Sequence, residues 1–167
     1  MGKIFDFFRR LPSSSRRGNA RVNEEALEFF NSLTATLEIE LSEPAQPVGG
    51  LLNLAAPPTA QVSAVRLDAK FFDAATETSR PLTKEELETV VFTASVLTLC
   101  GERDTPVSHQ APEGERFTVQ ALLTAIEATE RQTRGQTQWL GGIDVHHIYS
   151  EGLHPTKKRR WEIAWGS

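Results

Sequence analysis

The spacing of apolar and polar residues changes along the chain, and each spacing predicts a type of element. Apolar residues occupy every second position from 33 to 41, which places them on one face of a strand. The same alternation over 65–71 predicts a second strand. The run 89–100 fits either a helix or a strand, and we interpret it as a strand because β-branched residues dominate it. Segments 143–150 and 160–165 predict an antiparallel C-terminal hairpin.

Three helices are predicted by their capping residues. Asn23 can accept a hydrogen bond from a free backbone amide at the start of a short helix that runs to Phe30. Thr83 and Glu86 have the spacing of a capping box, so a helical turn begins there. The third and longest helix spans 118–134, where apolar residues recur on one side and polar residues on the other. We place the carboxylates of this longest helix on its solvated face.

The order of these elements predicts an α+β fold. Strands that are joined mostly by loops, such as 43–60 and 101–114, favour a largely antiparallel sheet of about five strands, with one main helix (118–134) packed on a face. We divide the chain into a basic arm with a flexible tether over residues 1–21 and one globular domain over residues 22–167.

The first twelve residues have a helical period of their own. Pro12 ends this predicted helix, and the polar segment 13–20 that follows is typical of a flexible tether. The apolar side of the helix comprises Ile4, Phe5, Phe7, Phe8 and Leu11, and the other side comprises Lys3, Asp6, Arg9 and Arg10. We predict that the apolar residues, together with Arg9 and Arg10, dock onto another protein or protein assembly. Two alternatives remain open, which are binding of residues 1–12 to an anionic membrane surface and folding of the helix back onto its own domain.

The charge is distributed unevenly. Residues 1–21 contain six basic residues and one acidic residue, a net of +5, so the total of −4 leaves −9 on the rest of the chain. An acidic body lacks the basic face of most nucleic-acid-binding domains, and this argues against a nucleic-acid partner. The only cysteine is Cys100, and the N-terminus has no long apolar segment. We therefore expect a cytoplasmic protein, which the arm could also attach to the periphery of a membrane.

Histidines and aromatic residues gather near the C-terminus. On a strand over 143–150, Asp144 and His146 share one side, while His147 shares the other with Tyr149. Asp144, His146 and His154 are the residues that would ligate a metal, and Glu151 would be the general base beside a metal-bound water. We favour the alternative in which they are ordinary structural residues, since the spacing of these ligands is not that of a known metal motif.

The chain contains no glycine-rich phosphate loop, nucleophile elbow or paired-histidine zinc helix. The sequence therefore predicts a non-enzymatic interaction module of the adaptor, inhibitor or immunity type, without a cofactor. A small metal-dependent hydrolase with the site around Asp144 is the alternative.

Overall fold

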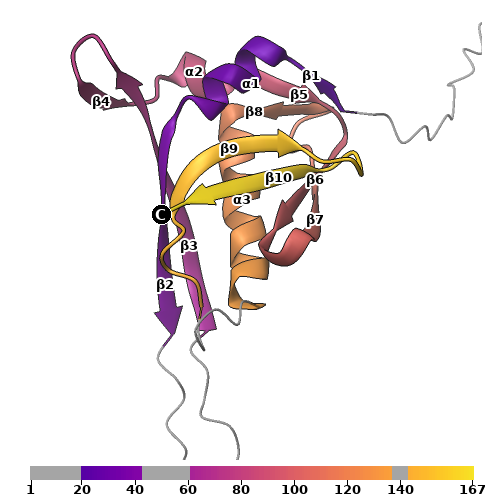
Figure 1. The fold of residues 1–167 in the computed structure, drawn as a ribbon. Coiled ribbons are helices and arrows are strands. Elements are labelled where there is room, and N and C mark those ends of the chain that lie inside the picture. Colours follow the sequence, from indigo (N-terminus) through magenta and orange to yellow (C-terminus); the bar gives the residue numbers. More distant parts are fainter. Residues whose placement is uncertain (1–19, 43–60, 137–142) are drawn as a thin grey trace, which may run out of the picture.

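The computed structural model describes residues 20–42, 61–136 and 143–167, and within them the fold is α+β, as predicted (Figure 1). The predicted N-terminal helix lies outside these residues. The elements, in chain order, are β1 (Arg21–Val22), α1 (Glu24–Asn31), β2 (Thr34–Ser42), β3 (Gln61–Asp73), β4 (Thr78–Pro81), α2 (Lys84–Glu88), β5 (Val90–Thr93), β6 (Val96–Gly101), β7 (Thr105–Gln110), β8 (Arg116–Thr118), α3 (Val119–Thr133), β9 (Tyr149–Pro155) and β10 (Trp161–Gly166), with 3-10 turns at Glu102–Asp104 and Arg134–Gln136.

The described strands form two sheets. The larger has seven strands in the order β4-β3-β2-β9-β10-β6-β7, and its neighbours pair antiparallel except for β10 and β6, which are parallel. The smaller sheet has the order β1-β5-β8. Figure 1 shows that β2 and β3 cross the direction of β9 and β10, so the large sheet curls around α3. One face of this sheet therefore packs on α3 and the other faces outward.

The core lies between α3 and the inner face of the large sheet. Alternation places Leu37 and Leu67 opposite each other in the β2–β3 register, and both are buried. The apolar side of α3 contributes Leu122 and Ile126, at 0% and 1% exposure. Burial of such side chains is the main favourable term in folding, at about 1.5–3 kcal/mol each. The alternation along β2 and β3 and the helical period of α3 thus identify the two surfaces that pack together in the core.

The prediction of one strand over 89–100 is wrong. The segment forms β5 and β6, which belong to different sheets. The chain breaks at Ala94, whose N–H donates to the Glu115 carbonyl at 2.8 Å, and at Ser95, whose carbonyl accepts from the Ala111 N–H at 2.9 Å. These bonds are made with residues distant in sequence, and a local propensity does not detect them. The number of strands is accordingly larger than the five that we predicted.

The predicted loop over 101–114 contains β7, an edge strand of the large sheet. β7 pairs with β6 over six residue pairs, although its own sequence is polar and includes Pro106. Proline is tolerated on an edge strand where its nitrogen faces away from the neighbouring strand. The prediction failed because an edge strand with one solvated side lacks the apolar run that marks an inner strand.

The strand predicted over 143–150 begins only at Tyr149 and extends to Pro155. Asp144 explains the shift, because its carboxylate oxygen Oδ1 accepts hydrogen bonds from the backbone N–H groups of His146 (2.9 Å) and His147 (3.2 Å). An aspartate that binds the amides following it favours a turn over an extended strand. The predicted alternation of side chains over 143–148 is therefore wrong as well.

Asn31 fills the gap where β9 separates from β2. These two strands pair at only one position, Thr36 with Tyr149. Beyond it, the Asn31 side chain accepts from the Leu153 N–H at 2.9 Å and donates to the Leu153 carbonyl at 3.2 Å. The side chain thus replaces a strand neighbour. Gly152 has φ 101° and lies so close that an added Cβ would approach Asn31 within 2.7 Å.

Replacing Asn31 with alanine should destabilise the fold by about 2 kcal/mol, since it leaves both backbone groups of Leu153 without their partner in a partly buried position. Urea unfolding measures the difference. Ser32→Ala is the control, because it removes one exposed hydrogen bond, from the hydroxyl to the Phe29 carbonyl, and should change stability by about 0.5 kcal/mol or less. Equal losses in the two variants would contradict this role of Asn31.

The three predicted helix caps are confirmed. The side chain of Asn23 accepts from the Ala26 N–H, Thr118 accepts from the Ala121 N–H, and Thr83 forms a capping box with Glu86. Arg80 on β4 adds a two-point ion pair to Glu86, with N–O distances of 2.7 and 2.8 Å. Hydrogen bonds from Arg80 and from the Thr83 backbone lower the pKa of Glu86 to about 2.

This pKa predicts how stability depends on pH. A carboxylate whose pKa is lowered by folding stabilises the fold above its unfolded pKa, and this stabilisation is lost as pH falls toward the folded value. Glu86→Gln should therefore cost about 1 kcal/mol at pH 7, a figure reduced for the solvent exposure of the pair. Urea unfolding at a series of pH values should show the deficit shrinking between pH 5 and pH 2. A deficit that does not change with pH would contradict the ionic origin.

Candidate partner-binding surface

The outward face of the large sheet carries the polar half of each alternating strand. Tyr149 stands on this face at 52% exposure, beside Thr36 of β2. The antiparallel register places Glu38 and Glu151 on either side of Tyr149, and Glu40 lies one step further along β2. We name this group, Glu38, Glu40, Tyr149 and Glu151, the acidic face.

The carboxylates of the acidic face are available to a partner. Glu38, Glu40 and Glu151 are exposed, and none of the three forms an ion pair within 4.0 Å in the described part of the chain. By contrast, the neighbouring Asp68 is neutralised by Lys70 at 2.7 Å. Arg66 lies opposite Glu38 in the β2–β3 register, and Glu38 also interacts electrostatically with Lys70. Because neither contact is a salt bridge within 4.0 Å, the acidic face attracts a cationic partner without the cost of breaking one.

Tyr149 is the aromatic member of this surface. Tyrosine offers a large apolar ring with a polar hydroxyl, and it is enriched among the residues that dominate binding energies at protein interfaces. The sequence pattern had placed Tyr149 on the inner side with His147, and the structure corrects this. The strand starts later than predicted, and its register shifts between Ala164 and Trp165 of the pairing strand. Gly152 within the strand is a sequence signal for such a bulge.

The residues predicted as a metal site do not form a ligand set. His154 projects from β9 opposite Glu162 and has its Nε2 3.3 Å from the Glu151 carbonyl oxygen. His146 is exposed, while the Asp144 carboxylate is buried and lies 2.7 Å from His147 Nδ1 instead. Within residues 20–42, 61–136 and 143–167, no three histidine, cysteine, aspartate or glutamate side chains are placed to hold a metal ion.

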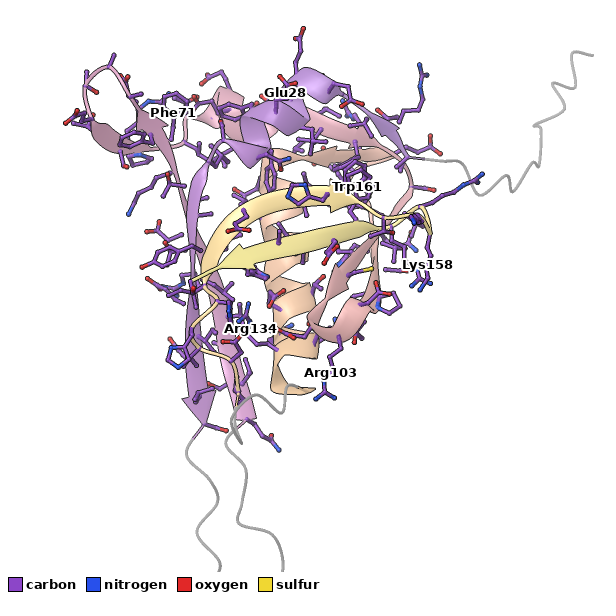
Figure 2. All side chains as sticks on the ribbon, in the orientation of Figure 1. Glu28, Phe71, Arg103, Arg134, Lys158 and Trp161 are labelled. Atoms are coloured by element: carbon purple, nitrogen blue, oxygen red, sulfur yellow. The ribbon has the colours of Figure 1, made fainter. Side chains whose placement is uncertain are left out.

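Asp144 belongs to a buried charge network at the C-terminal end of α3. Arg134, at 0% exposure, donates from Nε to Glu130 Oε2 at 2.7 Å and from Nη1 to the Asp144 carbonyl at 3.0 Å. Trp165 of β10 donates from Nε1 to Glu130 Oε1 at 3.0 Å, and the Arg134 guanidinium lies 5.3 Å from the Trp165 ring. Figure 2 shows Arg134 toward the lower end of α3. The network connects α3 to β10 and to the segment before β9.

The network corrects the placement of the carboxylates of α3. The sequence assigned Glu127 and Glu130 to a solvated helix face, but Glu130 is fully buried and Glu127 accepts from the Leu67 N–H at 2.8 Å. Burial raises the pKa of Glu130, and Arg134 and Trp165 oppose this rise. Burial also acts on Asp144, but the hydrogen bonds from His146 and His147 prevail and lower its pKa. These groups hold the end of α3 against β10 and the segment before β9.

A groove of ≈ 840 Å³ lies on another side of the molecule, between α2, β7, β8 and the exposed edge of α3. Half-buried His109 of β7 lines it, with Nε2 2.8 Å from the Thr129 hydroxyl. Because that hydroxyl donates to the Ala125 carbonyl, it accepts from Nε2–H, so the ring carries its proton on Nε2. Burial lowers the pKa of His109 and favours this neutral form.

No helix within the described residues is both long and apolar enough to cross a membrane. Comparison of the chain with protein-family models found no match, and neither the curated proteins nor the solved structures that were compared with it gave a match.

Proposed function

We propose that this protein is a non-enzymatic interaction module that binds a basic surface of a partner protein through the acidic face. The observation that carries the proposal is an exposed tyrosine set among three carboxylates on the outward side of central strands, where none of the three forms an ion pair within 4.0 Å in the described part of the chain. The strands fix these side chains before binding, which reduces the entropy lost on association. An inhibitor or immunity protein that masks a cationic site needs such a surface.

The charge of the body supports the same function. A net of −9 over residues 22–167 attracts a cationic partner from a distance and accelerates association. The turn between β9 and β10 is basic, and its Lys158 pairs with Asp104 at 3.2 Å. This turn is therefore not part of the acidic surface. In this proposal the predicted N-terminal helix is a second contact. No observation on the described residues favours the alternative of a metal-dependent hydrolase.

A pull-down from native lysate with a charge-reversed variant tests the proposal. Glu38→Lys combined with Glu151→Lys should abolish capture of a basic protein that the wild type retains. The matched control is Glu77→Lys with Glu115→Lys, which changes the net charge equally at exposed positions elsewhere and should retain the captured protein. Loss of capture with both variants would show that only the total charge matters, and capture by both would show that the acidic face is not the contact.

A further inference from the structure

The groove beside α3 is suited to binding the bulky apolar side chains of a helix. Its wall along α3 includes three small residues about one turn apart, Ala121, Ala125 and Ala128, besides Gln120 and Thr124, and Leu87 of α2 lines the groove as well. Small residues leave depressions into which larger side chains of a second helix can pack. The volume of ≈ 840 Å³ lies within the roughly 300–1,000 Å³ of ligand pockets, enough for several side chains but not for an entire helix.

The N-terminal arm has dimensions that match. The residues of α3 that line the groove run from Gln120 to Ala128, about 12 Å of helix at 1.5 Å per residue. The apolar side chains of the arm run from Ile4 to Leu11, about 10 Å on the same scale. Three of these five side chains are phenylalanines, which fill the depressions left by alanines. A helix this short is marginal in water on its own and gains most from such packing.

The connection between the arm and the body can reach the groove. The arm joins the body at β1, and β1 belongs to the same small sheet as β8, which forms one wall of the groove. β1 and β8 are two strand spacings apart, about 10 Å. Residues 12–20 span up to about 30 Å when extended. The tether therefore permits the contact within one molecule.

The charges also permit the contact. Two basic residues (Lys84 and Arg116) and two acidic residues (Glu88 and Glu113) line the groove, so its own charges cancel. The opposite side of the arm carries Arg9 and Arg10, which would face solvent at the rim of an acidic body. Apolar packing would hold the arm in the groove. The attraction between the net charge of +5 on residues 1–21 and that of −9 on residues 22–167 would favour its approach.

We propose that the groove between α2, β7, β8 and α3 holds the apolar side of the chain's own N-terminal helix, residues 4–11. In this arrangement the arm is stored on its own domain until a partner competes for it. The proposal rests on the groove and the arm alone, so it can fail while binding through the acidic face holds, and the reverse is equally possible.

Hydrogen–deuterium exchange of the full chain without a partner tests this contact. The amides of residues 4–11 should exchange at least about tenfold more slowly than unprotected amides, because they are released only by local opening. Ala121→Arg with Thr124→Arg fills the groove with charge and should remove this protection. The control is Ala74→Arg with Ala75→Arg in the exposed β3–β4 turn, which adds the same charge and should preserve it.

A second variant does not touch the folded body. Phe5→Ser with Phe8→Ser leaves the groove intact, and it should remove the protection of the arm and increase exchange of the amides of α3 that line the groove. Fast exchange of residues 4–11 in the wild type, or equal protection in the groove variant, would overturn the proposal. Protection of residues 4–11 that depends on protein concentration, together with a dimer detected by light scattering, would also overturn the proposal. That result would show that the helix in the groove comes from a second copy of the chain.

Discussion

Replacing Arg134 with methionine is expected to lower the free energy of unfolding by about 3–5 kcal/mol at pH 7. The variant leaves the Glu130 carboxylate buried, with its remaining hydrogen bond from Trp165 at 3.0 Å. An uncompensated buried charge is costly because water no longer solvates it. Urea unfolding monitored by tryptophan fluorescence measures the loss.

The pH dependence of this deficit identifies its cause. Without Arg134 the pKa of Glu130 in the folded state rises further above its unfolded value. A carboxyl group whose pKa is higher in the folded state than in the unfolded state destabilises the fold at pH values where it is ionised. This destabilisation disappears once the group is protonated. The deficit should therefore shrink as pH falls from 7 toward 5. Combining Arg134→Met with Glu130→Gln should recover part of the stability at pH 7, and a double variant as unstable as the sum of the two single variants would contradict the coupling.

Replacing Tyr149 with alanine is expected to weaken binding of the captured partner by about 30-fold or more, as for an interface residue worth about 2 kcal/mol. The free energy of unfolding should change little because half of the side chain is already exposed. Phe72→Ala is the control, since Phe72 is 46% exposed but lies in the β3–β4 hairpin, beyond the residues that pair with β2. Titration calorimetry with the captured partner measures both.

Equal affinity of the wild type and Tyr149→Ala would exclude Tyr149 as an anchor. Equal weakening by Phe72→Ala would place the contact on exposed apolar surface in general. Raising the salt concentration should weaken the wild-type complex by reducing its association rate, because charges on exposed strands are screened.

The sequence predicted the fold best where the pattern is local. The alternation over 33–39, the caps at Asn23, Thr83 and Thr118, and the apolar side of α3 each depend on residues a few positions apart, and the structure confirms them. The alternation fails at Leu41, which follows a register shift and is 44% exposed. Bonds between segments that are distant in sequence could not be predicted from local patterns. The break between β5 and β6 depends on carbonyl and amide groups of Glu115 and Ala111.

The site was predicted less well because it depends on register. The assignment of Tyr149 to an inner face assumed an unbroken strand from 143, and the turn made by Asp144 with the amides of His146 and His147 invalidates that assumption. Similarly, the helical period of 3.6 residues led us to place Glu130 on the solvated face of α3, and this placement is wrong. Its burial follows from Arg134 and Trp165, which the period alone does not bring together.

The most direct test of the account is photo-crosslinking from the acidic face. Tyr149 is replaced by p-benzoylphenylalanine in the full chain, and Thr124, an exposed residue lining the groove, receives the same replacement as the control. Irradiation in native lysate should join position 149 to a basic protein and leave position 124 without that product. Absence of a crosslink from position 149, or the same product from both positions, would contradict binding through the acidic face.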